Sequence, residues 1–248
     1  MPTKQAYLFQ SVPPLTAGEM NVTFIDLSHT FEEGMPGFRL KKEDGTYTQF
    51  TAKIHPFLTR EQMKPMFKGD CSFEITEMSF QTSIGTYIDS PYHRYQDGRD
   101  ISEIRIDEVI LPGMTLDVRG RSALQGIYKD AIDDSLDLRG KAVLFNFGWD
   151  KYWGDEQYYS YPYLARDTVE VLIERGAKLV GVDTINIDDM HDLTRPAHSL
   201  LLRNDILVVE NLTNLEQTLG KQFRFFAVPI KARKVAAMPI RALAEIAG

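Results

Sequence analysis

Two residues of the segment 83–93 (SIGTYIDSPYH), Asp89 and His93, could do chemistry together. Gly85 and Pro91 bracket a stretch that cannot continue as regular structure, so we expect a loop to present both side chains. A carboxylate and an imidazole four residues apart can share a metal ion, or Asp89 can bind while His93 moves protons. The alternative is an Asx-type turn beside a surface histidine.

A second pair of residues with chemical potential lies later in the chain. His198 precedes an apolar run at 200–202, and Glu210 follows the run ILVV, which should be deeply buried. A buried carboxylate is costly to ionise unless a cation or hydrogen-bond donors meet it, so Glu210 needs a partner. That partner is either a cation or a set of donors such as backbone N–H groups, Arg203 or Arg224.

The segment 83–93 also carries a family resemblance. The chain resembles the metal-dependent cyclase/kynurenine formamidase-like hydrolases, whose central motif is H-x-G-T-H-x-D-x-P-x-H. Five motif residues are kept, namely Gly85, Thr86, Asp89, Pro91 and His93. The likeness continues in the same order at 26–38, 147–153, 181–188 and 198–215.

The resemblance implies a set of metal ligands and a proton-transfer residue. Members of that family hold one or two divalent ions, so the expected ligands here are Asp89, His198 and Glu210, with His93 as the acid/base. Two carboxylates and one imidazole suit Zn²⁺ or Mn²⁺, and three ligands leave positions open for water and substrate, as in catalytic sites. We therefore expect one divalent ion as the cofactor.

Ser83 and Tyr87 stand where the family motif has two further histidines. Neutral serine is a poor ligand, and a phenol with an unperturbed pKa near ~10 binds only a strongly acidic ion, so one metal position should be lost. Tyr87 would then either fill the emptied space, hydrogen-bonding Asp89 or Glu210, or act as a catalytic acid. We expect Ser83 and Trp149 to contact the substrate.

These residues lead to three functional hypotheses. The first is a hydrolase that opens a C–N bond of an amide, a formamide or a small cyclic amide, with lactones as further substrates. The second is a metal-free binding protein or pseudoenzyme on the same fold. The third is a lyase or isomerase that uses Tyr87. Among the other histidines, His29 is the better candidate for touching the site, whereas His55 and His191 lie in expected loops, and the carboxylates of 183–189 either cluster or cap turns.

The elements that must position these residues can be read from hydrophobic periodicity. The sequence predicts strands at 22–27, 73–80, 141–149, 178–183, 206–210 and 224–230, a helix at 163–175 and a helical turn at 241–247. Strict alternation predicts that 73–80 is half-buried, whereas the continuous apolar run of 141–149 predicts burial on both faces. A strand–helix–strand unit indicates a mixed α/β class.

A Pro-rich arm at 1–20 and a single domain at 21–248, with a polar excursion at 41–70, are the expected organisation. The resemblance implies a swivelling β/β/α cyclase-like fold with a mixed central sheet. It also implies a homo-oligomer, either a dimer or a tetramer, with the arm and the excursion as contacts.

Composition excludes several partners. The 248 residues carry 28 Lys+Arg and 35 Asp+Glu, so the net charge of −7 gives no basic footprint for nucleic acid. No apolar stretch approaches the ~18 residues of a membrane span, and no signal peptide is evident, so we expect no membrane partner and a cytoplasmic location. Cys71 is the single cysteine and forms no internal disulfide. A small-molecule substrate is the expected partner.

Overall fold

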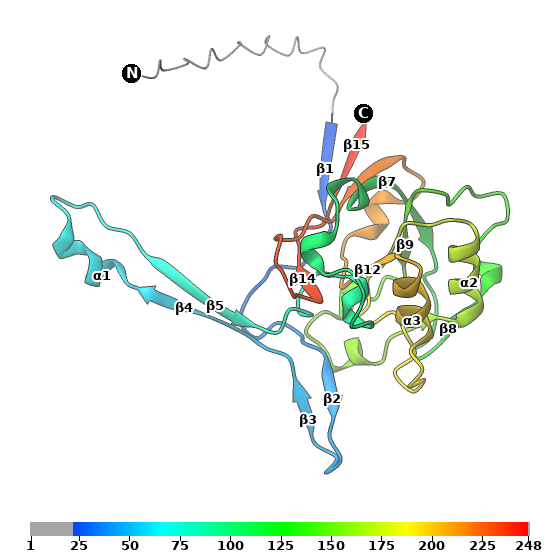
Figure 1. The fold of residues 1–248 in the computed structure, drawn as a ribbon, viewed down its shortest axis with the longest axis horizontal. Coiled ribbons are helices and arrows are strands. Elements are labelled where there is room, and N and C mark those ends of the chain that lie inside the picture. The colour runs from blue at the N-terminus through cyan, green and yellow to red at the C-terminus, as the bar shows by residue number, and fades with distance from the viewer. Residues whose placement is uncertain (1–21, 248) are drawn as a thin grey trace, which may run out of the picture.

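The computed structural model describes residues 22–247 and is organised around one large mixed sheet (Figure 1). In sheet order its strands are β1 (Val22–Asp26), β15 (Leu243–Ala247), β13 (Phe223–Phe226), β7 (Ile110–Asp117), β9 (Ala142–Asn146), β11 (Leu179–Val182), β12 (Leu207–Glu210), β6 (Tyr87–Asp89) and β14 (Ala237–Pro239). The four central strands from β7 to β12 run parallel, and the flanking pairs are antiparallel. The mixed α/β class is confirmed.

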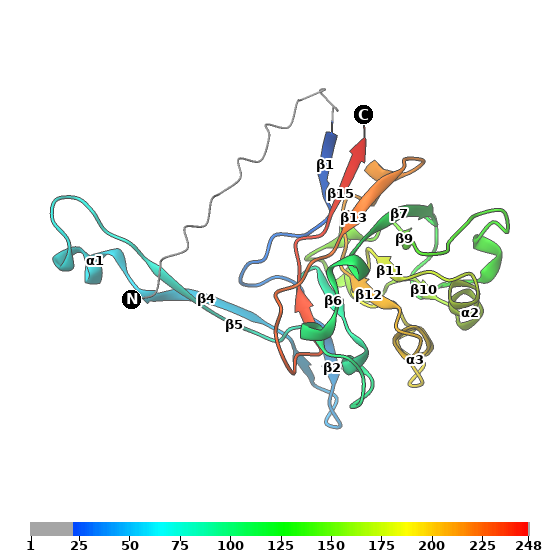
Figure 2. The ribbon, with the colours of Figure 1, turned by 45° about the horizontal axis from the view of Figure 1, so that its top comes forward.

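Two helices, α2 (Arg166–Glu174) and α3 (Pro196–Arg203), cover one face of this sheet (Figures 1 and 2). Apolar residues of α2 recur at helical spacing, so Val169 and Leu172 are buried against the sheet. A left-handed glycine, Gly176, with φ of +76°, follows the helix and lets the chain turn back toward β11. The predicted helix is confirmed, although it starts later than expected.

Strand β9 shows why the central run of the sequence is apolar without alternation. Val143 and Phe145 pack into the cluster under the helices, and Leu144 packs into a second cluster on the opposite face. Every residue of β9 is buried. The prediction of burial on both faces is therefore confirmed.

Three two-stranded sheets accompany the large one among the described residues. They are β2 (Arg39–Lys41) with β3 (Tyr47–Gln49), β4 (Ala52–Leu58) with β5 (Ile75–Phe80), and β8 (Gly126–Ile127) with β10 (Tyr163–Leu164). We call residues 52–80 the arm. It consists of β4, the short helix α1 (Arg60–Met63) and β5, and it projects away from the body (Figure 2).

Two expectations about local structure are wrong. The strand predicted at 73–80 exists as β5, but its residues are exposed rather than half-buried, because β5 pairs with β4 alone and projects from the body. The helical turn predicted at 241–247 is strand β15, which pairs with both β1 and β13. Pairing on two sides outweighs the weak helical preference of this short segment.

No helix within residues 22–247 has the length and apolar character that crossing a bilayer requires. The Pro-rich N-terminal segment predicted at 1–20, which is distinct from the arm of residues 52–80, lies outside the described residues.

A substitution at Gly181 in β11 tests the close packing of the central sheet. A Cβ at this position would lie 2.6 Å from Leu144 Cδ2 and 2.7 Å from Leu212 Cδ1, both in the core. Gly181→Ala should therefore lower the free energy of unfolding by about 1–3 kcal/mol, measured by chemical denaturation. In a Leu144→Val background the same change should cost less, because one of the two clashing atoms is gone. An equal cost in both backgrounds would contradict the packing.

Candidate active site

The register of two strands places three polar residues on one face of the sheet. Strands β6 and β12 are antiparallel, and Tyr87 lies directly opposite Glu210. Residues two apart on a strand share a face, so Asp89 points the same way as Tyr87. Ile88, between them, packs into the cluster on the opposite face. The three polar side chains thus converge beneath α3.

His93 reaches this group from the turn that follows β6. Pro91 starts a 3-10 turn at Pro91–His93, and the His93 amide donates to the Ser90 carbonyl. This turn brings His93 Nδ1 to 3.2 Å from Asp89 Oδ1. The His93 side chain is 34% exposed, whereas Asp89 is fully buried, so His93 is the member of the group that meets solvent.

His198 reaches the group from the first turn of α3 and is held in place by Asp188. The Nδ1–H group of His198 donates to Asp188 Oδ2 over 2.6 Å. The Asp188 carboxylate also accepts from the backbone amides of Ala197 and His198. Because Nδ1 is committed, Nε2 faces the buried carboxylates, 3.6 Å from Asp89 Oδ2 and 3.5 Å from Glu210 Oε1.

These separations fit a divalent cation better than they fit hydrogen bonds. Both Asp89 oxygens are buried and have no hydrogen-bond partner among residues 22–247. Ligand atoms about 2.1 Å from a tetrahedral ion lie roughly 3.4 Å from one another, close to the spacing seen here. Within the described part of the chain, Asp89, His93 and His198 offer ligand atoms that all lie within 4.8 Å of one another.

The electrostatics of the group also favour a cation. Burial opposes protonation of His198, but Glu210, Asp188 and Asp89 outweigh it and raise the His198 pKa well above its usual range. Burial raises the pKa of Glu210 to about 7, against the attraction of His198. The carboxylates of Asp89, Asp188 and Glu210 thus surround a single buried imidazole, and this excess of acidic groups favours a cation.

Tyr87 fills part of the space beside these carboxylates, as one of the sequence alternatives predicted. Its hydroxyl donates to Glu210 Oε2, and the amide of Ile187 donates to Glu210 Oε1 over 2.7 Å. Burial, and then Glu210, raise the pKa of Tyr87 well above its ordinary value, so the phenol keeps its proton. The expectation that Glu210 has a partner is confirmed, and Arg224 is not that partner, since it pairs with Glu245.

A cavity of 250 Å³ opens beside this cluster. Tyr87, His93 and His198 line its inner side together with Ser83, where we expected a substrate contact. Trp149 does not line it. The Trp149 amide donates to Asp183 Oδ2, and the ring packs in the core under the helices, which places Trp149 away from the site expected for it.

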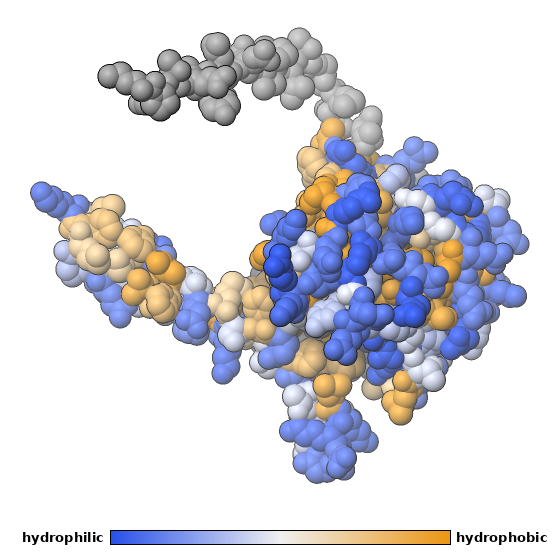
Figure 3. Space-filling model, in the orientation of Figure 1, coloured by the Kyte–Doolittle hydropathy of each residue, from blue (hydrophilic) through white to orange (hydrophobic). Residues whose placement is uncertain are grey.

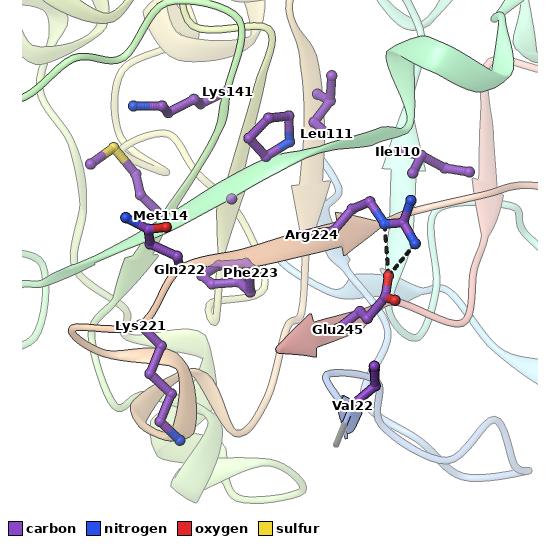
Figure 4. A pocket seen from close by; sticks show the side chains of 12 residues that line it. Val22, Ile110, Leu111, Met114, Lys141, Lys221, Gln222, Phe223, Arg224 and Glu245 are labelled. Atoms are coloured by element: carbon purple, nitrogen blue, oxygen red, sulfur yellow. Dashed lines mark hydrogen bonds and ion pairs between the residues drawn. The ribbon is translucent and has the colours of Figure 1, made fainter. Parts of the chain in front are cut away.

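A larger cavity of 720 Å³ lies over β7, β13 and β15 (Figure 4). Its walls are mostly apolar, among them Leu111 and Phe223, and its charged groups include the ion pair between Arg224 and Glu245. It contains no histidine, so it offers none of the proton-transfer chemistry of the smaller cavity.

The remaining histidines lie outside the cluster. His29 stacks on Trp153 with ring centroids 3.8 Å apart, and burial lowers its pKa to about 4, which keeps it neutral. His55 lies on the arm near Glu77, and His191 is exposed in a loop.

Two features of the site were not predicted from the sequence. Asp188 was grouped with turn-capping carboxylates, yet it holds both the backbone and the ring of His198; its distance of ten residues from His198 gives no local signal. The apolar wall of the cavity comes from Phe38, Leu40 and Phe50, around the β2–β3 hairpin. Of these three residues, Phe50 belongs to the excursion predicted at 41–70 as a polar flap, so that segment contributes one apolar residue to the site.

The fold and site together define a class: a mixed-sheet α/β protein with a buried carboxylate–imidazole cluster at the ends of its strands. The sequence profile described as "Putative cyclase" matches residues 25–189. The chain belongs to this putative cyclase family.

Relatives and solved structures agree with this assignment. The chain is 30% identical over 181 residues to the kynurenine formamidase of Erythrobacter litoralis, a match covering 67% of this chain and 81% of the relative. It is 26% identical over 172 residues to the kynurenine formamidase of Bacillus cereus, covering 69% and 80%. Isatin hydrolase A from Ralstonia solanacearum shares the fold with a TM-score of 0.79 at 22% identity, covering 91% of this chain and 92% of that one.

Asp188 can be tested as the residue that positions His198. Asp188→Asn should weaken the binding of Mn²⁺ about 10–100-fold, because the His198 ring loses the carboxylate that fixes its orientation. Calorimetric titration of the metal-free protein measures this. Asp189→Asn is the matched control, since the Asp189 carboxylate accepts from the amide of His191 in an exposed loop and should leave affinity unchanged. Equal affinities of all three proteins would contradict the positioning role.

Proposed function

We propose that this chain is a hydrolase that opens a C–N bond, other than a peptide bond, in a formamide, another amide or a small cyclic amide. The names of its relatives support this class of reaction, because kynurenine formamidases match most of the chain and isatin hydrolases share its fold. The unpartnered Asp89 carboxylate, at ligand spacing from His93 and His198, is the observation that carries the proposal.

The proposed cofactor is one divalent ion, Zn²⁺ or Mn²⁺. Asp89 and His198 would hold it. Glu210 is the proposed third ligand, since its Oε1 lies 3.5 Å from His198 Nε2, whereas the residues whose ligand atoms all lie within 4.8 Å of one another are Asp89, His93 and His198. When bound, such an ion polarises a carbonyl group and lowers the pKa of water. Two carboxylates also balance its charge within the buried site.

His93 is the proposed acid/base. It lines the cavity, and its partial exposure lets it exchange protons with solvent. In the reaction the water oxygen bonds to the carbonyl carbon, His93 takes a water proton, the C–N bond breaks, and His93 delivers that proton to the leaving nitrogen. Tyr87 keeps its proton and orients the Glu210 carboxylate through their hydrogen bond.

Metal content and turnover of variants test this proposal together. The Asp89→Asn variant should lose the ion, because an NH₂ group replaces one of the two carboxylate oxygens of residue 89. His93→Ala should keep the ion and hydrolyse N-formylkynurenine, formanilide and isatin at least about 100-fold more slowly than the unaltered protein. Elemental analysis and initial rates measure these effects, with His55→Ala on the arm as the control.

Three outcomes would contradict the proposal. An unaltered protein that binds neither Zn²⁺ nor Mn²⁺ would make the chain a metal-free binding protein. Loss of the ion in His93→Ala would make His93 a ligand rather than the acid/base. Unchanged turnover in His93→Ala would remove proton transfer from this residue.

We also propose that the chain forms a homo-oligomer in which the arms of two copies dock on each other's bodies. An isolated two-stranded ribbon is marginally stable in water, yet the arm carries six large apolar side chains that are 37–73% exposed. They are Phe57, Met66, Phe67, Phe73, Ile75 and Met78. Figure 3 shows pale and orange atoms along much of its length.

A second copy of the chain is the partner that fits this surface. An apolar hollow of 520 Å³ lies at the base of the arm, lined in part by Phe31, Phe80, Met238 and Ile240. Each copy thus carries both an apolar ribbon and an apolar hollow, so docking about a two-fold axis covers both. Six side chains, each about half exposed, offer roughly 600 Å² per arm. Together with the hollow, this approaches the ~800 Å² per partner of a stable interface.

The oligomer can be tested by light scattering coupled to gel filtration. The unaltered chain should have the mass of a dimer or a tetramer, and the double variant Phe57→Ser, Met66→Ser should shift to a smaller species with unchanged circular dichroism. Phe24→Ser is the control, because Phe24 is similarly exposed on β1, away from the arm. A monomeric unaltered chain, or an arm variant of unchanged mass, would contradict this proposal.

A further inference from the structure

Two arginines, Arg94 and Arg195, line the cavity beside the candidate metal cluster. Several other arginines in the described part of the chain form ion pairs with carboxylates, for example Arg99 with Glu108. Neither Arg94 nor Arg195 forms an ion pair with a carboxylate of residues 22–247. Both residues therefore line one small cavity without a direct ion-pair partner among the described residues. The pKa of Asp192, lowered mainly by hydrogen bonds with Thr194, is also lowered by the charges of Arg166 and Arg195.

Both arginines are held by neutral groups of the loop before α3 and of α3 itself. Arg94 Nη2 donates to the Thr194 carbonyl over 3.3 Å and to Ser199 Oγ over 3.2 Å. Arg195 Nη1 donates to the Asp189 carbonyl over 3.3 Å. Burial raises the pKa of Tyr161, near Arg195, so that phenol stays neutral and supplies no counter-charge either. Both side chains are thus positioned by neutral groups and lack an ion-pair partner among residues 22–247.

The backbone at Arg195 supports a specific role for this residue. Its φ of +48° and ψ of 62° lie in the left-handed region, which is costly for a residue with a Cβ, and Pro196 follows directly. The loop holds this conformation through bonds from the Arg195 amide to the Asp192 carbonyl and from the Ser199 amide to the Arg195 carbonyl. Non-glycine residues in such conformations cluster at ligand-binding sites.

Apart from the two arginines and the two histidines, the residues that line the cavity are uncharged. Phe38, Leu40 and Phe50 supply an apolar side, which suits a flat hydrocarbon or aromatic group. Asn186 is 8% exposed; its side-chain carbonyl accepts from the amide of Asp188, which leaves its NH₂ group as a donor at the cavity. The cavity lining therefore combines hydrogen-bond donors and guanidinium groups with an apolar surface.

We propose that Arg94 and Arg195 form an anion subsite that selects amide substrates carrying a carboxylate next to an apolar, preferably aromatic, group. This deepens the hydrolase proposal and rests on it for the reaction, although anion binding can be measured without turnover. Guanidinium groups bind carboxylates through paired, charge-assisted hydrogen bonds, which a neutral amide of the same shape cannot form. The two arginines are specificity residues and take no part in bond breaking.

Binding of benzoate and of its neutral isostere benzamide tests the subsite independently of catalysis. The metal-loaded protein should bind benzoate at least about tenfold more tightly than benzamide. Arg94→Gln and Arg195→Gln should each reduce that ratio, the double variant should bring it close to one, and Arg195→Lys should restore part of it. Arg166→Gln on the exposed face of α2 is the control for loss of one charge.

A bound metal ion would also attract benzoate. The same titrations distinguish binding by the metal from binding by the arginines. Repeating them with metal-free protein should leave a benzoate preference that still depends on the arginines. If the preference disappears with the metal, or survives in the double arginine variant, the subsite is overturned.

Kinetics distinguish failure of the subsite from failure of the hydrolase proposal. The unaltered protein should hydrolyse 4-formamidobenzoate with a KM about tenfold below that for 4-formamidobenzamide and with similar kcat. Arg195→Gln should raise the KM for 4-formamidobenzoate and leave the KM for 4-formamidobenzamide unchanged. Hydrolysis of both substrates with equal KM values overturns the subsite alone. Absence of hydrolysis with arginine-dependent benzoate binding overturns the reaction and leaves the subsite standing.

Discussion

Asp89, a buried carboxylate with no hydrogen-bond partner among residues 22–247, is the constraint on which the rest of the site depends. Ionised groups are stable in a protein interior only when opposite charge or donors meet them. Here the groups around Asp89 are two imidazoles, at 3.2 Å and 3.6 Å, rather than backbone donors. Replacing either imidazole with an apolar side chain would remove a group that offsets the cost of burying this carboxylate.

The sheet makes this arrangement possible through register. Because Tyr87 and Glu210 are opposed across β6 and β12, a change at either position acts directly on the other. A phenol at position 87 places a proton donor against Glu210, where a metal ligand would instead place a lone pair. The hydrogen bond therefore satisfies one carboxylate oxygen that would otherwise seek a cation, which favours a single ion at this site.

The sequence was sufficient for the features that local pattern determines. The continuous apolar run of β9, the helix at α2 and the burial of Glu210 all follow from residue types. It was insufficient where distant contacts decide. Nothing near β15 indicates that two strands will pair with it, and Asp188 and Phe38 join the site only through the fold. The alternation of β5 gave the right element but the wrong burial, because periodicity cannot say whether a face is covered.

The net charge of the chain does not describe the charges around the cavity, where acidic and basic residues lie side by side. The chain carries a net charge of −7, and the floor of the site adds buried carboxylates, so an anionic substrate approaches against repulsion. Arg94 and Arg195, which line the cavity beside that floor and have no ion-pair partner among residues 22–247, oppose this repulsion. A cation bound between Asp89 and His198 would act in the same direction. Metal ligation and substrate selection would then reinforce one another, since each positive group makes the approach of a carboxylate less unfavourable.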